Sequence, residues 1–100
     1  MDLQQYERMQ HHLRQTHETA KFQLIMTELG LASIYCQMAA SANEQPKAER
    51  NVENARRAYV AAMHFLESAA LTIEMRSQVH KKLRELKPML LKLEGARSIL

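Results

Sequence analysis

The sequence predicts an all-α fold, a three-helix antiparallel up-down-up bundle with a long first helix. Glycine and proline number only two each in the 100 residues, whereas a sheet protein of this size needs many tight turns, which favour these residues. Residues that favour helices dominate the composition. Apolar residues also recur at steps of three and four, the spacing of one helix face. One domain of three helices accounts for all of these features.

The first helix is expected over residues 2–42. Asp2 is a good N-cap, and no strong stop precedes the sequence Ser41-Ala42-Asn43. The helix either continues through Thr16 or breaks there. Glycine inside a helix costs about 1 kcal/mol relative to alanine, so Gly30 is interpreted as a close-packing site or a mild kink.

The inner face of this helix is expected to be a stripe of apolar residues, widened by Phe22, Ile25, Met26 and Leu29 so that residues 22–35 are buried on more than one side. The stripe runs through Tyr6, Met9, Leu13, Ala20, Leu24, Leu31, Ile34 or Tyr35, Met38 and Ala42.

The second helix is expected over residues 46–69, because Pro46 suits the first turn of a helix. Its inner face is expected to hold Ala48, Val52, Ala55, Tyr59, Ala62, Met63 and Leu66. A short turn at Ala70-Leu71 should lead into the third helix.

The third helix is expected over residues 73–94, with Thr72 as its N-cap. Pro88 falls inside the pattern and should kink the helix. Gly95 is a good residue just past a helix end, and residues 96–100 are expected to form a frayed tail. The inner face keeps the strictest period of the three, at Met75, Val79, Leu83, Leu86, Leu90 and Leu93.

The predicted lengths do not match. The first helix would span roughly 60 Å and its companions roughly 33–36 Å, which leaves the N-terminal part of the first helix without a partner in the chain. Tyr6, Met9 and Leu13 would then form an exposed apolar stripe, which suggests an interface. A homo-oligomer, most simply a symmetric homodimer, or a partner protein would cover these residues.

The composition bears on the cellular location of the chain, on disulfide formation and on the charge of a partner. A single cysteine, Cys36, excludes an intrachain disulfide, and it is interpreted as a small buried hydrophobe. No signal peptide and no run of about 18 apolar residues is visible, so no membrane partner is expected and the cytoplasm is the expected location. The formal net charge is +3, divided as −2 over residues 1–45 and +5 over residues 46–100. The second half could favour an acidic partner.

Residues 55–62 resemble the second helix of a tetratricopeptide repeat, in which an alanine, an aromatic four residues later and an alanine three residues after that pack against the first helix. Ala55, Tyr59 and Ala62 match this pattern, and Leu29-Gly30 is similar to the Leu-Gly pair of that repeat's first helix. Leu29-Gly30 lies too far before Ala55 for a true repeat, and no second copy is present. The chain resembles tetratricopeptide-like or microtubule-interacting-and-transport-like helical bundles, which implies binding of peptides or partner helices without chemistry.

Five histidines invite a metal interpretation, but none of the pairs among His11, His12 and His17 has the spacing of three or four residues that places two rings on one helix face. No cofactor, no small-molecule substrate and no enzymatic activity is therefore expected, and the chain is predicted to be a non-catalytic protein-interaction module. The alternative is a nucleic-acid-binding protein that uses a basic face of the second and third helices. The residues of that face to test are Arg56, Arg57, Lys81 and Arg84.

Overall fold

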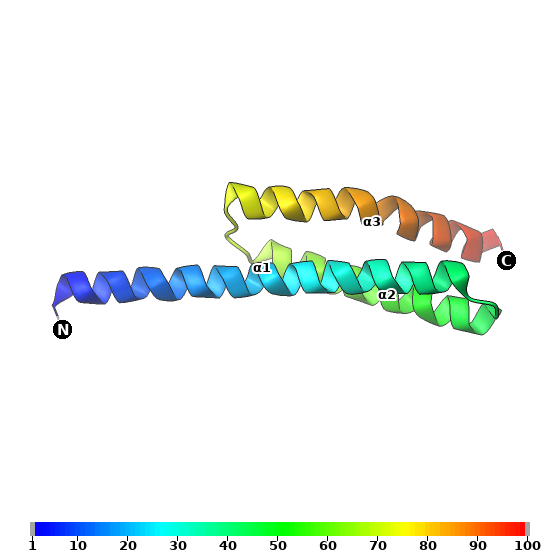
Figure 1. Ribbon diagram of the computed structural model, residues 1–100, viewed down its shortest axis with the longest axis horizontal. Helices are drawn as coiled ribbons and strands as arrows, with labels where there is room; N and C mark the ends of the chain where they lie inside the picture. The colour runs from blue at the N-terminus through cyan, green and yellow to red at the C-terminus, as the bar shows by residue number, and fades with distance from the viewer. Residues whose placement is uncertain (1, 100) are drawn as a thin grey trace.

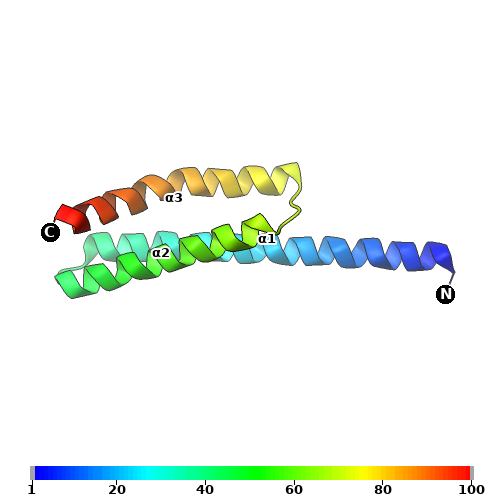
Figure 2. The ribbon, with the colours of Figure 1, turned by 180° about the vertical axis from the view of Figure 1, so that it is seen from behind.

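The computed structural model describes residues 2–99, with side chains through Gly95. It contains the helices α1 (Leu3–Ser41), α2 (Gln45–Glu67) and α3 (Ile73–Ile99), with no strand among the described residues. α2 runs back along α1, and α3 returns in the direction of α1 (Figures 1 and 2). α1 packs against both other helices. The prediction of an all-α, up-down-up bundle with a long first helix is confirmed.

α1 is one unbroken helix of 39 residues. The Asp2 carboxylate accepts the backbone N–H of Gln5 at 2.8 Å, and the Gln5 side chain accepts the backbone N–H of Asp2 at 3.3 Å, which is a reciprocal N-terminal cap. The helix does not break at Thr16, whose hydroxyl donates to the His12 carbonyl at 3.0 Å and is thereby satisfied within the helix.

Gly30 also lies inside α1, and α1 shows no bend in Figures 1 and 2. A Cβ built at Gly30 would meet no atom within 4 Å. The interpretation of Gly30 as a close-packing site is therefore wrong, because no neighbouring backbone approaches it.

α2 begins at Gln45, with Pro46 in its first turn, and ends at Glu67. Two side chains of α1 hold the turn that follows. The Lys21 ammonium donates to the Ser68 carbonyl at 2.9 Å, and the Glu18 carboxylate accepts the backbone N–H of Ala70 at 2.8 Å. The lysine places a positive charge at the negative end of the α2 dipole. These contacts fix the level on α1 at which the other two helices begin to pack.

α3 begins at Ile73, where the Thr72 hydroxyl accepts the backbone N–H of Met75 at 3.1 Å. It continues through Pro88 and Gly95 to Ile99, and its C-terminal half slopes toward α1 in Figures 1 and 2. The predicted end at residue 94 is therefore too early. Gly95 does not adopt the positive φ of a helix-terminating glycine, so the expected tail, residues 96–100, belongs to α3 as far as Ile99. Leu100 lies outside the described residues.

The core lies along the C-terminal half of α1. α1 and α2 meet through small side chains, which let two helices pack closely, and α3 adds larger ones. The buried cluster consists of Ile25, Leu29, Ala32 and Cys36 from α1, Ala55, Ala58 and Ala62 from α2, and Val79, Leu86 and Leu90 from α3. The interpretation of Cys36 as a buried hydrophobe is confirmed, since its side chain is 1% exposed.

The expected inner face of α1 is wrong in its C-terminal half. The core uses Ile25 and Leu29, expected only to widen that face, together with Ala32, Cys36 and Ala39. Four residues expected at its centre are exposed, namely Leu24, Leu31, Ile34 and Met38. Tyr35, the alternative to Ile34, is partly buried against the core. α1 carries two apolar stripes, and both repeat at steps of three and four residues. Only the stripe that faces α2 and α3 is buried.

Candidate protein-interaction surface

The exposed stripe of α1 forms a single face, which we call the outer face. It consists of Tyr6, Met9, Leu13, Leu24, Leu31, Ile34 and Met38, joined through His17, Ala20 and Thr27 at steps of three and four residues. Steps of three and four residues are the pattern by which one helix pairs with another. At 100° per residue the outer face points roughly 130° away from the buried stripe. The two packing faces of α1 are therefore separate.

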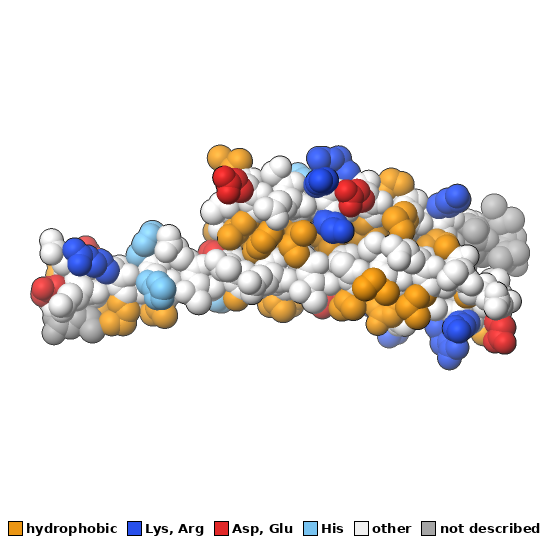
Figure 3. Space-filling view, in the orientation of Figure 1, with side chains coloured by type: hydrophobic (Ala, Val, Ile, Leu, Met, Phe, Trp, Pro, Cys, Tyr) orange, Lys and Arg blue, Asp and Glu red, His pale blue; other side chains and the backbone are white. Residues whose placement is uncertain are grey.

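The N-terminal half of the outer face lies on a segment that projects from the bundle. The molecule measures 65 × 21 × 17 Å, and residues 3–17 extend beyond the turn held by Glu18 and Lys21 (Figure 1). We call this segment the arm. Tyr6 is 52% exposed and Leu13 is 53% exposed. Figure 3 shows hydrophobic side chains along the lower edge of the arm.

All three residues expected from the sequence to form an interface lie on the arm, and the structure leaves them exposed. Met9, at 41%, is the least exposed of the three. Sequence reasoning missed the second half of the surface, because it assigned Leu24, Leu31 and Ile34 to the core. The sequence does contain a signal for this surface, because α1 carries two apolar stripes that are offset around the helix. The sequence interpretation treated the two stripes as one wide inner face.

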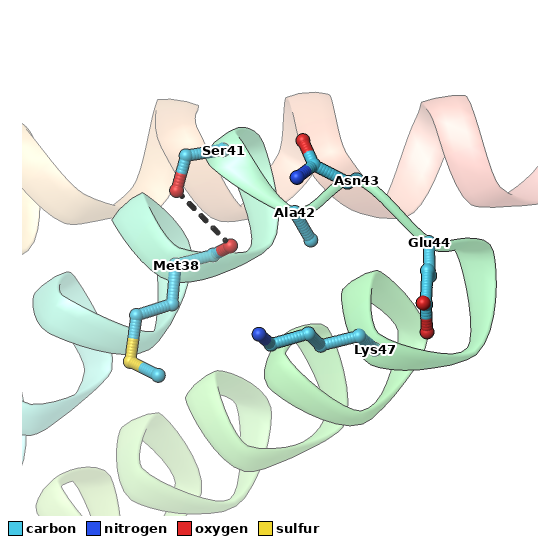
Figure 4. A pocket seen from close by; sticks show the side chains of 6 residues that line it. All are labelled: Met38, Ser41, Ala42, Asn43, Glu44 and Lys47. Atoms are coloured by element: carbon cyan, nitrogen blue, oxygen red, sulfur yellow. Dashed lines mark hydrogen bonds between the residues drawn. The ribbon is translucent and has the colours of Figure 1, made fainter.

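A shallow pocket of about 240 Å³ lies at the C-terminal end of the outer face. Figure 4 shows Met38 and Ser41 of α1 on one side and Lys47 of α2 reaching toward Met38 from the other. The Ser41 hydroxyl donates to the Gln37 and Met38 carbonyls at 3.1 and 3.4 Å, so it is occupied within its own helix. The lining combines the apolar side chains of Met38 and Ala42 with the Lys47 ammonium, the Asn43 amide and the Glu44 carboxylate.

The residues proposed as a basic face are not gathered on one side of the bundle. The Arg56 guanidinium lies 3.5 Å from Glu94 of α3 and 3.6 Å from Glu53, and Arg57 lies 3.7 Å from Glu53. Lys81 lies on the other flank of α3, where it lines a shallow groove against Met26 of α1. Glu94 and Lys81 point roughly 140° apart around α3 at 100° per residue.

The fourth member of that set, Arg84, is exposed on α3. Because the arginines of α2 are partly neutralised by carboxylates and Lys81 faces a different seam, these four cations do not form one continuous basic stripe of the kind that favours a phosphate backbone.

The polar side chains do not assemble a metal site within the described part of the chain. No group of three or more His, Cys, Asp and Glu residues is positioned to hold a metal ion there. All five histidines are exposed, and three of them lie on the arm. Burial, reinforced by the negative charge of Glu94, raises the pKa of the Cys36 thiol, so this cysteine is protonated and enclosed.

The helices between residues 2 and 99 include none that is long and apolar enough to cross a membrane. Comparison with known protein families, curated proteins and solved structures found no match. The outer face of α1 is an exposed apolar stripe with the spacing of a helix-pairing surface.

Proposed function

We propose that this chain is a non-catalytic protein-interaction module that binds a helix along the outer face of α1. The supporting observation is the alignment of exposed apolar side chains on one face of α1. They form two groups, one on the arm around Tyr6 and Leu13 and one on the bundle from Leu24 to Met38, and His17 and Ala20 lie between the groups on the same face. Scattered exposed apolar residues are ordinary in soluble proteins, whereas apolar groups aligned on one helix face are typical of an interaction site.

The spacing of the outer face supports a helical partner in particular. Residues at steps of three and four accept the side chains of a second helix as knobs in holes, which is also how helix-in-groove recognition works. The arm strengthens this argument, because an isolated helical segment of about 15 residues is marginal in water. A partner on the arm supplies the tertiary contacts that its own chain does not.

The expected likeness to tetratricopeptide-like and microtubule-interacting-and-transport-like bundles is part of this proposal, since such bundles bind peptides or helices. So is a cytoplasmic location, which a single buried thiol suits because it needs no oxidising compartment. A fluorescent fusion in the native host tests the location.

The interaction is tested by proximity labelling in the native host, with the wild-type chain and with a variant that carries Tyr6→Ser, Met9→Ser and Leu13→Ser. A matched control carries Val60→Ser and Leu91→Ser, which remove exposed apolar side chains of α2 and α3 that lie off the outer face. We expect labelled partners, including further copies of the chain, to be lost in the triple variant and kept in the control. The same partners in all three samples would overturn the proposal.

A further inference from the structure

We propose that the occupant of the outer face is a second copy of this chain, paired antiparallel with α1 along its full length. This inference rests on the proposed function and adds the identity and the register of the partner. In a two-fold dimer the same face serves both copies. The axis would cross α1 near residue 22, which is the midpoint of Leu3–Ser41.

The placement of the bundle on α1 supports this axis. The contacts from Glu18 and Lys21 to the α2–α3 turn, and the first buried residue, Ile25, bracket the same midpoint. Residues 3–20 and residues 24–41 each span roughly 27 Å. An antiparallel pair centred here lays the arm half of each α1 on the outer face of the other copy's bundle half. The two halves have equal lengths, so neither extends beyond the other.

The register brings most apolar residues of the two copies together, while Ile34 falls opposite the partner's Gln10. Leu13 meets the partner's Leu31, and Ala20 meets the partner's Leu24. The less apolar positions also meet each other, with His17 opposite the partner's Thr27. A parallel pair would instead place two His17 rings against each other at the centre of the seam, where a polar pair is costly.

Charge complementarity favours the same arrangement. Arg14 and Glu28 occupy the same flank of the outer face, and neither forms an ion pair within the described part of the chain. The antiparallel register places Arg14 beside the partner's Glu28, twice per dimer, and parallel alignment brings no opposite charges across the seam. Lys21, on the same flank, is directed to its own Ser68 carbonyl.

The pocket beside Met38 gives the register a further anchor. The partner's Tyr6 falls opposite Met38, at the mouth of the pocket shown in Figure 4. A tyrosine ring there would contact the Met38 thioether and lie near the Lys47 ammonium, both of which interact favourably with aromatic rings. Tyr6 is the aromatic residue of the arm, so pocket and ring are matched by position and chemistry.

The buried area distinguishes full-length pairing from pairing of the arms alone. A helix seam about 10 Å wide and 58 Å long buries roughly 600 Å² per copy, or about 1,200 Å² in total. Two arms alone would bury less than half of that. A stable biological interface needs about 1,000 Å² in total, so only the full-length seam reaches that size.

The first experiment measures mass by sedimentation velocity over a concentration series of the full chain. We expect a reversible monomer–dimer equilibrium. Leu13→Ser should raise the dimer Kd by about 30-fold, because a half-exposed leucine is buried twice in a symmetric dimer. Ile34→Ser, on the bundle half of the outer face, should weaken the dimer similarly, and Leu91→Ser on α3 should leave Kd unchanged. An effect at Leu13 without one at Ile34 would overturn full-length pairing.

The second experiment tests the register by disulfide formation in a glutathione redox buffer. Two differently tagged chains carry Leu13→Cys and Leu31→Cys, each with Cys36→Ala so that the native thiol does not react. We expect the mixed disulfide between the two chains and little of either symmetric one. Circular dichroism and dimer mass of Cys36→Ala alone verify that this background folds and pairs. Predominance of either symmetric disulfide would overturn the antiparallel register.

The two proposals fail in different ways. A chain that remains monomeric at every concentration overturns the pairing with a second copy, while labelling of other proteins that depends on Tyr6, Met9 and Leu13 would still support the interaction module. If the labelled partners are the same with and without these three substitutions, the proposal of an interaction module is overturned.

Discussion

Leu29 and Leu24 are two leucines five residues apart on α1, and the account predicts opposite consequences for replacing them. Leu29 is 0% exposed at the centre of the core, whereas Leu24 is 47% exposed on the outer face. Leu29→Ala should lower the free energy of unfolding by about 3 kcal/mol, because replacing a buried leucine with alanine costs about 2–5 kcal/mol. Leu24→Ala loses only the area that its own helix covers, for which we expect about 0.5–1 kcal/mol.

The difference between these two losses is large relative to the total free energy of unfolding. A domain of this size is stabilised by about 5–15 kcal/mol, and the alanine-rich contact of α1 with α2 buries little apolar area per residue. At 4–8 °C per kcal/mol, Leu29→Ala should lower the Tm by about 12–24 °C, and Leu24→Ala by less than about 8 °C.

The assay is urea unfolding followed by circular dichroism, with both substitutions made in a Leu13→Ser background and measured below the dimer Kd of that background, so that pairing of α1 does not contribute. We expect unchanged m values and a clear separation of the two midpoints. Equal losses from the two substitutions would refute the assignment of Leu24 to an outward face and, with it, the proposed binding surface.

Three further predictions address other features of the fold. Gly30→Ala should raise the free energy of unfolding by about 0.5–1 kcal/mol in urea titrations, because the added Cβ has open space and alanine is the better helix former; a loss would show a hidden close contact. Lys21→Met should cost about 1 kcal/mol and speed amide exchange in the α2–α3 turn, because the Ser68 carbonyl loses its charged donor; unchanged exchange there would argue against that contact. Burial and Glu94 raise the pKa of Cys36, so stability should fall as the pH rises above the ordinary thiol pKa of about 8.5, where the unfolded thiol ionises first. Cys36→Ala should remove that fall in pH-dependent unfolding, and its persistence would assign it to another group.

The nature and number of the helices could be predicted from the sequence because the relevant signals are local. Asp2 as a cap, Pro46 in a first turn and Thr72 as a cap each act within one helical turn, and the structure places all three in those roles. The end of the third helix was predicted wrongly because Gly95 is also only a local signal. A glycine can end a helix but does not have to, and nothing beside it in the sequence distinguishes the two outcomes.

The division of α1 into two faces could not be predicted, because periodicity alone does not say which of two apolar stripes meets the rest of the chain. The helix α2 supplies small side chains such as Ala55 and Ala58, which join Ala32 and Cys36 of α1 in the buried cluster, while the large residues of the outer face stay exposed. The burial of Asn51 was not predicted either. It is buried and donates to the Lys47 carbonyl at 3.1 Å, a contact within the helix that makes its burial acceptable.

The arm was predicted from a length argument, which depends only on the rise per residue of a helix and the position of the breaks. The three arm residues predicted to form an interface are therefore exposed, as expected. The rest of the outer face was wrongly assigned to the core.

Amide hydrogen exchange along α1, measured as a function of protein concentration, decides whether the outer face of α1 pairs with a second copy. Amides of residues 6–17 have no tertiary support in one copy of the chain and should exchange quickly when it is dilute. We expect their protection to rise with concentration, in step with the dimer mass, while amides around Leu29 stay protected throughout. Arm amides that exchange equally fast at every concentration, or that are equally protected when dilute and monomeric, would contradict it.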